Sequence, residues 1–406
     1  MKLSEELQWR GFWNQTTFTN DKLIDSEDFT LYLGTDPSAD SLHVGHLAVY
    51  MMVRHFLERG HKVFLLVGGG TGMIGDMRDT EERSLLSYAE IEHNKRALKA
   101  QVSQIFAGRD FTLVDNADWL GNLELIPFLR DIGKNFNMAE LTAREFFKAR
   151  ISNGKGLSFA EFTYTLLQGY DFWHLFKHHG VNLQIGGSDQ WGNLLSGVEL
   201  IRKKENVEVY AMTAPLLINK STGRKFGKSE GGAVWLDETK TSVYKFYQFW
   251  LNVDDESAIE YMKIFTMLDR DTIEAIAENH AVNPGARSAQ KVLAREVTDI
   301  VHGANRRESV ERVTEVLFGG GDFRQLSDDD LDALSQEIPR VDVGVGVIEA
   351  LVVSGAVSSN GEAKRLLKSG SISLNGEKIA EDQAVNTTSL LKKGKNTFVL
   401  IMEGDE

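Results

Sequence analysis

Two histidines follow a tight turn in the loop after the first apolar segment of the chain. Residues 34–38 read Gly-Thr-Asp-Pro-Ser, and His43-Val44-Gly45-His46 follows where the pattern predicts the start of a helix. A helix N-terminus offers free N–H groups and the positive end of its dipole, which together favour anions, and Gly45 lets a flat group approach the backbone. This loop therefore favours a cradle for a triphosphate and a purine, with imidazole donors for phosphate oxygens. A histidine-rich helix start, or half of a metal site, is the alternative.

A glycine-rich segment follows the second apolar run. Residues 68–76 read Gly-Gly-Gly-Thr-Gly-Met-Ile-Gly-Asp, in which Gly70-x-Gly72-x-x-Gly75 has the spacing of a dinucleotide-binding turn. The acidic residue that such a turn needs some twenty residues later falls on a predicted surface helix. A glycine-rich wall around a small substrate, with Asp76 as its carboxylate, is equally compatible.

Two lysines flank a Phe-Gly pair in residues 225–229, which read Lys-Phe-Gly-Lys-Ser. The end of this stretch resembles a phosphate-binding loop, but that motif has four residues between its glycines, and three separate Gly223 from Gly227. A loop whose Lys225 and Lys228 fold over a polyphosphate is the favoured interpretation. A solvated basic turn is the alternative.

The helix expected after Phe159 carries a polar stripe. Tyr164, Gln168 and Asp171 have the i, i+4, i+7 spacing of one helix face, where a phenol, an amide and a carboxylate could hold a polar ligand. The stripe continues to His174 and His178, a spacing that metal sites also use. We favour surface histidines near a helix end over a metal site here.

A further strand–Gly-Gly–helix junction spans residues 184–193. Gln184 belongs to its strand, and Asp189 and Gln190 open its helix. The structural alternative is that Ser188 or Asp189 simply caps that helix.

The elements that must position these residues alternate through the first half of the chain. Strands are predicted at 29–33, 63–67, 183–185 and 207–212, and helices from Gly45, Ile91, Ile126, Phe159 and Asp189. Strand–helix alternation of this kind predicts an α/β domain with a doubly wound, largely parallel sheet. Ligands of such sheets bind beyond the carboxyl ends of the strands, where the loops described above begin.

The pattern changes in the second half of the chain. Residues 242–318 read as helices, the stretches 319–322 and 327–332 as a boundary, and the last sixty residues as two short helices with a strand–turn–strand around Asn375-Gly376. We predict these domains: 1–222 catalytic with a helical insertion, 223–241 loop and linker, 242–320 helical, 321–343 linker, and 344–406 C-terminal module.

The composition is that of an ordinary folded protein. The chain has 406 residues, 42% hydrophobic and 26% charged, with a formal net charge of −14 and no cysteine. The lack of cysteine excludes disulfides, thiolate metal sites and cysteine nucleophiles. A nucleic-acid surface must then be a local patch, and residues 361–395 supply one, with seven Lys and Arg against four acidic residues. The N-terminus lacks the basic start and apolar run of a signal peptide, and no segment is long enough to span a membrane, so we expect a cytoplasmic protein.

In order and spacing these segments resemble the class I aminoacyl-tRNA synthetases, and within them the bacterial tyrosyl-tRNA synthetases. Residues 43–46 are similar to the first signature sequence of the class and residues 225–229 to its second, and 32–36, 163–171 and 183–193 also resemble this branch. The likeness continues to about Lys395. It implies a Rossmann-like catalytic domain, an α-helical anticodon-side domain and a small α+β RNA-binding module.

The resemblance implies a tyrosine–tRNA ligase, which forms tyrosyl-adenylate and pyrophosphate from tyrosine and ATP and then transfers the tyrosyl group to the 3′-terminal adenosine of tRNA(Tyr). It implies Mg²⁺ carried with ATP, no resident metal and a homodimer, with Phe159 as a plausible interface anchor. The implied catalytic residues are His43, His46, Lys225, Lys228 and Ser229. The implied tyrosine-binding residues are Tyr32, Asp76, Tyr164, Gln168, Asp171 and Gln184. The implied ATP-binding residues are Gly34, Asp36, Ser38, His43, Gly45, His46, Asp189, Gln190 and Lys228. The implied tRNA-binding residues are Lys364, Arg365, Lys368, Lys392, Lys393 and Lys395.

The chain departs from the family pattern at three places. The loop 77–83 lacks a lysine that some members use near pyrophosphate, and Arg78 or Arg83 could replace it. Leu33 and Val49 stand where smaller or polar residues can touch the ribose, and the C-terminal tail is short and acidic. Three alternative functions remain: tryptophan activation, an inactive RNA-binding protein, and a nicotinamide enzyme built on the glycine segment.

Overall fold

The computed structural model describes residues 1–76, 85–144, 147–148, 150, 157–218, 223, 226–229 and 232–403, with the backbone alone at 228 and 229. By their contacts the residues form two compact units. Unit 1 consists of Met1–Ser242 and Phe249–Val301, and unit 2 of Val243–Gln248 and His302–Glu406. The predicted domain limits differ from this division and stay predictions.

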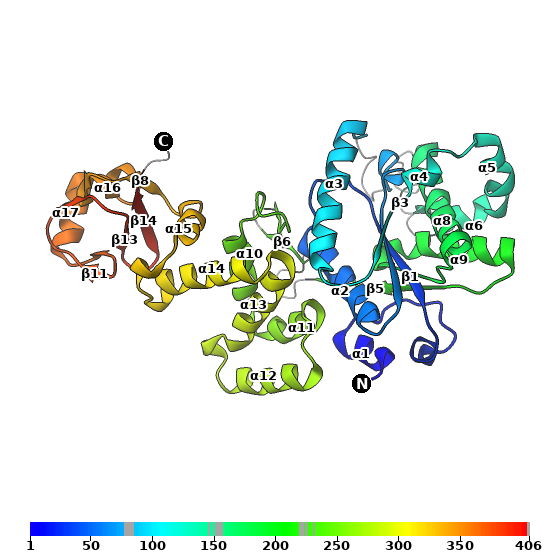
Figure 1. Cartoon of the computed structure of the whole chain (residues 1–406), viewed down its shortest axis with the longest axis horizontal. Coiled ribbons are helices and arrows are strands. Elements are labelled where there is room, and N and C mark those ends of the chain that lie inside the picture. Colours follow the sequence, from blue (N-terminus) through cyan, green and yellow to red (C-terminus); the bar gives the residue numbers. More distant parts are fainter. Residues whose placement is uncertain are drawn as a thin grey trace. The chain divides into compact units, whose positions relative to one another are not determined.

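Unit 1 is built on a parallel sheet with the strand order β3-β2-β1-β4-β5. Its strands are β1 (Thr30–Thr35), β2 (Lys62–Val67), β3 (Thr112–Asp115), β4 (Leu183–Gly187) and β5 (Tyr210–Ala214). The chain adds β2 and β3 on one side of β1 and then β4 and β5 on the other. Since parallel crossovers are right-handed, the two halves send their helices to opposite faces, and Figure 1 shows α3 on one side of the sheet with α8 and α9 on the other. The predicted doubly wound fold is confirmed.

The helices around this sheet begin close to where the sequence places them. They are α1 (Leu3–Arg10), α2 (Val44–Glu58), α3 (Tyr88–Ile105), α4 (Ala117–Leu120), α5 (Leu125–Asp131), α6 (Met138–Thr142), α8 (Phe159–His179) and α9 (Trp191–Glu205). Ser158 caps α8 in a capping box with Glu161, and Gly180 ends that helix in the left-handed conformation. The alternative that Ser188 or Asp189 caps α9 is wrong. These residues form a short 3₁₀ turn, and among the described residues no side chain caps α9.

Strand β3 is missing from the sequence prediction. Its residues, Thr112–Asp115, are four in number and only Asp115 is buried, because β3 lies at the edge of the sheet next to β2. A short, half-exposed edge strand lacks the continuous apolar run by which the central strands are found. This omission matters, because the residues directly after β3 enter the site.

The register of the central strands selects which side chains face α8. Tyr32 of β1 pairs with Phe64 of β2 and with Gln184 of β4, so all three side chains point to the same face. On that face Tyr32 and Phe64 pack with Phe172 and other residues of α8 and α9. Tyr32 and Gln184 are each at most 2% exposed.

A group of helices completes unit 1, as the sequence predicts for residues 242–318. These helices are α10 (Val243–Leu251), α11 (Asp255–Phe265), α12 (Arg270–Val282) and α13 (Ser288–His302), of which α10 is shared between the units. The hydrophobic face of α13 is fully buried at Leu293, Ala294 and Val297. None of the helices in the described residues is both long and apolar enough to cross a bilayer.

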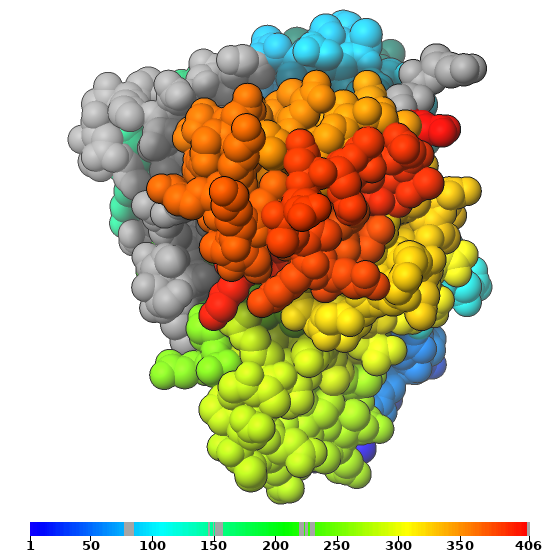
Figure 2. All heavy atoms as spheres, turned by 90° about the vertical axis from the view of Figure 1, so that its left-hand side faces the viewer, coloured from blue at the N-terminus to red at the C-terminus, as the bar shows by residue number. Residues whose placement is uncertain are grey.

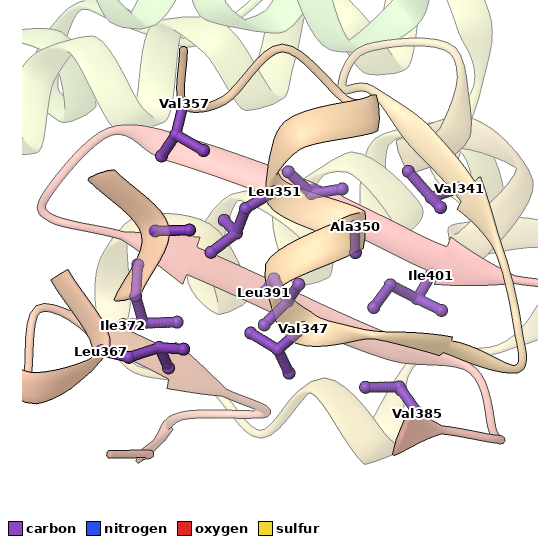
Figure 3. Close-up of a cluster of buried hydrophobic side chains, with 12 residues drawn as sticks. Val341, Val347, Ala350, Leu351, Val357, Leu367, Ile372, Val385, Leu391 and Ile401 are labelled. Atoms are coloured by element: carbon purple, nitrogen blue, oxygen red, sulfur yellow. The ribbon is translucent and has the colours of Figure 1, made fainter. Parts of the chain in front are cut away.

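Unit 2 contains a five-stranded sheet with the order β11-β10-β13-β14-β8 and two small helices packed on it. Its elements are α14 (Ala304–Thr314), α15 (Asp328–Ser335), β8 (Arg340–Asp342), β9 (Val345–Gly346), α16 (Val347–Val353), α17 (Asn360–Lys368), β10 (Ile372–Leu374), β11 (Glu377–Lys378), β12 (Ala384–Val385), β13 (Ser389–Lys393) and β14 (Thr397–Met402). Figure 3 shows Val347 and Leu351 of α16 pointing at Leu391 and Ile401 of the sheet. The predicted hairpin at Asn375-Gly376 is present, and both residues have the positive φ of a tight turn.

Residues 327–332, interpreted as a boundary, contain the start of a helix, and the boundary itself stays a prediction. Ser327 caps α15, whose first turn holds the acidic residues. Asp330 is fully buried and accepts hydrogen bonds from Arg312 of α14 at 2.8 and 2.9 Å. Although burial opposes ionisation, the bonds from Arg312 and Ser327 lower the pKa of Asp330 to about 2. The acidic run is thus a helix N-terminus joined to α14 by an ion pair whose carboxylate is buried and whose guanidinium is partly exposed.

Candidate active site

The candidate site lies where the strand order reverses. After β1 the chain turns to one side of the sheet, and β4 begins the other side, so the loops after β1 and β4 diverge at the carboxyl ends of two neighbouring strands. Such a switch point leaves a crevice for ligands in doubly wound sheets. The predicted site residues 34–46 and 184–193 come from these two strands and the loops and helices that follow them.

The first signature segment forms the N-terminus of α2. His43 is the N-cap, and its Nδ1 accepts the Gly45 N–H at 3.0 Å, while the His46 Nδ1 accepts the His43 N–H at 3.3 Å. The two rings stack with centroids 3.8 Å apart. Since each Nδ1 is an acceptor, the proton of each neutral ring is on Nε2. The predicted imidazole donors therefore have a defined donating nitrogen.

The state of His46 follows from its surroundings. Burial, and then the neighbouring His43, lower its pKa to about 3. His46 is therefore neutral near pH 7 and can donate a hydrogen bond but carries no charge. A Cβ at Gly45 would lie 2.9 Å from the His43 ring, so the glycine is what allows this ring to fold over the helix end.

The second signature segment lies against the first. The Val44 N–H donates to the Val234 carbonyl at 3.0 Å, and the Val234 N–H donates to the Gly227 carbonyl at 2.9 Å. His43 and Trp235 form an isolated antiparallel bridge. A Cβ at Gly227 would collide with the side chain of Val44. Val44 and Val234, 190 positions apart in the sequence, are thus brought together.

The lysines of that segment are only partly described. Lys225 lies outside the described residues, as do Arg78 and Arg83. Lys228 and Ser229 form strand β6, which pairs with β7 (Gly232–Ala233). The predictions for their side chains therefore stay predictions.

Three buried polar atoms near the face of α8 lack a partner. Among the described residues none hydrogen-bonds the Tyr32 hydroxyl, the Gln168 Oε1 or the Gln184 Oε1. Burial, and then the nearby Asp171, raise the pKa of Tyr32 well above its ordinary value. Buried polar atoms are normally hydrogen-bonded, so these three indicate a polar ligand or water between α8, β1 and β4. All three belong to the residues predicted to bind tyrosine.

Asp171 is held by two donors that the sequence analysis missed. Asn116 Nδ2 donates to its Oδ2 at 2.9 Å, and Trp119 Nε1 donates to its Oδ1 at 2.7 Å. Burial raises the pKa of Asp171 to about 7, although these two bonds lower it. Asn116 and Trp119 follow β3, so recognising that edge strand would have pointed to them.

A chain of side-chain hydrogen bonds joins this carboxylate to the loop after β1. Asn116 also donates to the Thr71 Oγ1 at 2.8 Å, Thr71 donates to Asp36 at 2.7 Å, and the Tyr164 hydroxyl donates to Asp36 at 2.8 Å. Tyr164, predicted on the tyrosine side, therefore contacts Asp36, predicted on the ATP side. Thr71 is another residue that the sequence analysis missed.

Asp76 is contacted from the β4 side. Gln190 donates to its Oδ2 at 2.8 Å, and Asn193 Nδ2 lies 3.4 Å from both carboxylate oxygens. Gln190 was predicted as an ATP residue, and Asn193 was not assigned a role. Asp189 and Ser38 are exposed, as is Gly34.

The glycine segment serves close packing between loops. A Cβ at Gly68 would collide with Asp36 and Thr71, and one at Gly72 would lie 3.0 Å from Pro37. The strand β2 is followed here by a single 3₁₀ turn, Thr71–Met73. A dinucleotide-binding turn needs a helix at this point to bind pyrophosphate. The structure therefore favours a glycine-rich wall around a small substrate over a nicotinamide-binding turn.

Of the histidines of α8, His174 packs against Trp119 and His178 packs against His174. The His174 ring stacks on the Trp119 indole with centroids 4.4 Å apart and contacts His178 at 4.3 Å. Burial, and then His178, lower the pKa of His174 to about 4. Within the described ranges no group of three or more metal-ligating side chains is found.

The predicted tRNA patch of unit 2 separates into two kinds of cation. Lys364, Arg365 and Lys368 are exposed on α17, which lies at the surface in Figure 2, in orange. Lys392 donates to the Leu317 carbonyl at 3.2 Å and lies over the Phe398 ring, and Lys393 donates to the Ala356 carbonyl at 2.5 Å. These last two contribute to the packing of unit 2. Lys395 is exposed.

Comparisons with known proteins agree with this architecture. Residues 25–319 match the family model of class I tRNA synthetases (W and Y). Residues 330–405 match that of the tyrosine–tRNA ligase SYY-like C-terminal domain. The match over residues 25–319 agrees with the fold and with the site at the switch point. The chain is therefore a class I tRNA synthetase of the tryptophan and tyrosine group.

Full-length relatives narrow the assignment. The chain is 42% identical to a tyrosine–tRNA ligase of Limosilactobacillus reuteri, over 100% of this chain and 98% of that one. It is also 42% identical to one of Bacteroides thetaiotaomicron, over 99% and 100% of the two chains. A truncated mitochondrial tyrosyl-tRNA synthetase of Aspergillus nidulans superposes with a TM-score of 0.71 at 29% identity, covering 78% of this chain and 94% of that one. The chain belongs to the tyrosine–tRNA ligase family.

Proposed function

We propose that this chain is an ATP-dependent tyrosine–tRNA ligase that forms tyrosyl-adenylate and then transfers the tyrosyl group to the 3′-terminal adenosine of tRNA(Tyr). The observation that carries the proposal is the set of partnerless buried atoms of Tyr32, Gln168 and Gln184 beside the anchored carboxylate of Asp171. Such a set of buried polar groups suits a ligand with a hydroxyl at one end and polar groups at the other.

The tyrosine end of the ligand is assigned to the interior of the site. Tyr32 and Asp171 bind the phenolic hydroxyl, because Asn116 and Trp119 each occupy one oxygen of Asp171 from behind and leave its remaining lone pairs as acceptors. Asp76, Tyr164 and Gln168 bind the ammonium group, and Gln184 lies near the carboxylate. Phenylalanine leaves the buried acceptors unpaired, and enzymes of this family are the reference case for such rejection, by about 10⁵-fold.

The ATP end is assigned to the loops at the switch point. Its residues are Gly34, Asp36, Ser38, His43, Gly45, His46, Asp189 and Gln190. The reaction is an in-line attack of the tyrosine carboxylate on the α-phosphate, which needs no base, so catalysis consists of positioning and of stabilising charge on the leaving pyrophosphate. Nε2–H donors of His43 and His46 suit phosphate oxygens, and Lys225, Lys228 and Ser229 close over the pyrophosphate. Mg²⁺ enters with ATP and shares its charge.

The decisive experiment is ATP–pyrophosphate exchange with each standard amino acid in turn, without tRNA. We expect exchange with tyrosine alone, followed by charging of tRNA(Tyr) when tRNA is added. Exchange with tryptophan would shift the assignment to the other branch of the family. No exchange with any amino acid would leave an inactive RNA-binding protein.

The tRNA contact is assigned to the exposed cations of α17 and to Lys395, since phosphate contacts need accessible positive charge. Reversing Lys364, Arg365 and Lys368 to glutamate should weaken tRNA binding and reduce its salt dependence, with adenylate formation unchanged. The control is Lys378→Glu, an exposed lysine of β11 that is not among the residues proposed to bind tRNA. Equal loss in both variants would mean that net charge, and not this patch, matters.

The protein is proposed to act as a homodimer in the cytoplasm. Exposed apolar side chains of α5, α6 and α8 support pairing: Leu125 and Ile126, Met138 and Phe159 are 58% to 71% exposed. Their helices share one hydrophobic cluster on their inner sides. Phe159→Asp should yield monomers in analytical ultracentrifugation, whereas Val282→Asp, at an exposed apolar position of α12, should not. A dimeric Phe159→Asp would remove this face from the interface.

A further inference from the structure

Phe226 differs from its neighbours in the second signature segment. It stands between Lys225 and Gly227, in a loop proposed to act through charged and polar side chains. Yet its own side chain is apolar and 5% exposed. The chemistry proposed above gives this ring nothing to do.

The ring is enclosed by four aromatic side chains of the helical region of unit 1. The centroid of Phe226 lies 4.4 Å from that of Tyr261 and 5.4 to 5.6 Å from three others, those of Phe249, Trp250 and Phe265. These four come from the last turn of α10 and from α11. Trp250 and Phe265 are fully buried and lie 4.7 Å from each other. We call these four residues the aromatic cage.

The backbone on either side of the ring is fixed as well. The Phe226 N–H donates to the Leu217 carbonyl at 2.8 Å, and the Gly227 carbonyl accepts the Val234 N–H at 2.9 Å. Gly227 has a φ of 82° and lies against Val44 at the start of α2. Phe226 therefore joins three parts of unit 1: the strand end near Leu217, the N-terminus of α2 and the cage.

We infer that Phe226 is a positioning residue for pyrophosphate-directed Lys228, which it holds through the aromatic cage. This inference rests on the proposed function. A lysine side chain has four rotatable bonds, so its ammonium group is placed reproducibly only if its backbone is fixed. Lys228 is two residues from Phe226, and a buried aromatic ring with four tilted ring contacts anchors the backbone locally. The helices that carry the cage thus fix the backbone from which the Lys228 side chain extends.

The test compares Phe226→Ala with Phe226→Met in ATP–pyrophosphate exchange. Alanine empties the cage, and we expect kcat to fall about 10- to 100-fold with the KM for tyrosine unchanged, because the lysine acts on the leaving group in the transition state. Methionine refills an apolar cavity with little strain and should restore kcat to within about threefold. A purely structural role would lower the amount of folded enzyme and leave kcat per folded molecule unchanged.

The folding control is Phe12→Ala, which opens a similar cavity at a residue 1% exposed near His55. Both alanine variants should lose thermal stability, but Phe12→Ala should keep its kcat. A second measurement is a double-mutant cycle that combines Phe226→Ala with Tyr261→Ala. Their effects on kcat should not add, because each substitution removes the same ring contact.

The outcomes are distinguishable. If the wild type shows no tyrosine-dependent exchange, the proposed function fails. If the wild type is active and folded Phe226→Ala keeps its kcat, or if the two cage variants add independently, the inference about Phe226 is overturned while the proposed function stands.

Discussion

The two halves of the candidate site are built in different ways. The half proposed to bind tyrosine consists of buried side chains held by other side chains: Asp171 is fixed by Asn116 and Trp119, and Tyr164 by Asp36. The half proposed to bind ATP consists of backbone, glycines and a helix end, with Gly34, Ser38 and Asp189 exposed. A half that discriminates between amino acids needs fixed, desolvated groups, because an unpaired buried group gives the largest penalty. A half that stabilises the charge of a leaving group needs hydrogen-bond donors and a surface that the ligand can reach.

The largest effect is expected in the buried half. Asp171→Ala should lower kcat/KM for tyrosine by about 10³-fold, since it removes a desolvated acceptor and leaves the donors of Asn116 and Trp119 unpaired. The KM for ATP should stay the same. Pyrophosphate exchange at varied tyrosine and ATP measures both, and an unchanged tyrosine affinity would end the assignment of the phenol to Asp171.

A smaller effect, on kcat and not on tyrosine affinity, is expected in the half proposed to bind ATP. Lys228→Ala should lower kcat by about 10²-fold with little change in tyrosine affinity, because its charge acts only on the leaving pyrophosphate. The matched control is Lys177→Ala, a lysine at the end of α8 paired with Glu205. Full activity of Lys228→Ala would remove the loop from the mechanism.

The helix end between the halves offers a third test. Gly45→Ala places a Cβ 2.9 Å from the His43 ring and should displace it, raising the KM for ATP about tenfold. Tyrosine binding, measured by fluorescence or calorimetry, should not change. A parallel loss of tyrosine affinity would mean that the two halves are not independent.

The smallest effect concerns stability and pH. Because burial raises the pKa of Asp171 to about 7 from an unfolded value near 3.8, the folded state binds the extra proton between these pH values. Stability from this group is therefore present at low pH and falls as the pH rises through 7. The wild type should lose about 2–3 kcal/mol of stability between pH 5 and pH 8, and Asp171→Asn should remove this dependence. Urea denaturation of both proteins at the two pH values measures it, and parallel curves would contradict the raised pKa.

The sequence was most informative where a functional motif lies within a single helix or at its end. His43 at the start of α2 and the polar stripe of α8 were both found from local patterns, because capping and helical spacing depend on near neighbours. Asn116 and Trp119 were missed because β3 is a short edge strand. The cation patch was found as a set, but composition does not reveal that Lys392 and Lys393 bind carbonyls inside unit 2.

The sequence by itself determined the class of fold, the family and the candidate residues, because these follow from periodicity and from motifs of a few residues. The tertiary structure alone decided which of them meet. The Asn116–Asp171 bond joins residues 55 positions apart, and the Tyr164–Asp36 bond joins residues 128 positions apart. Such contacts depend on strand order, register and the faces that helices bury. Those features are set by packing of the whole chain and not by any local stretch of it.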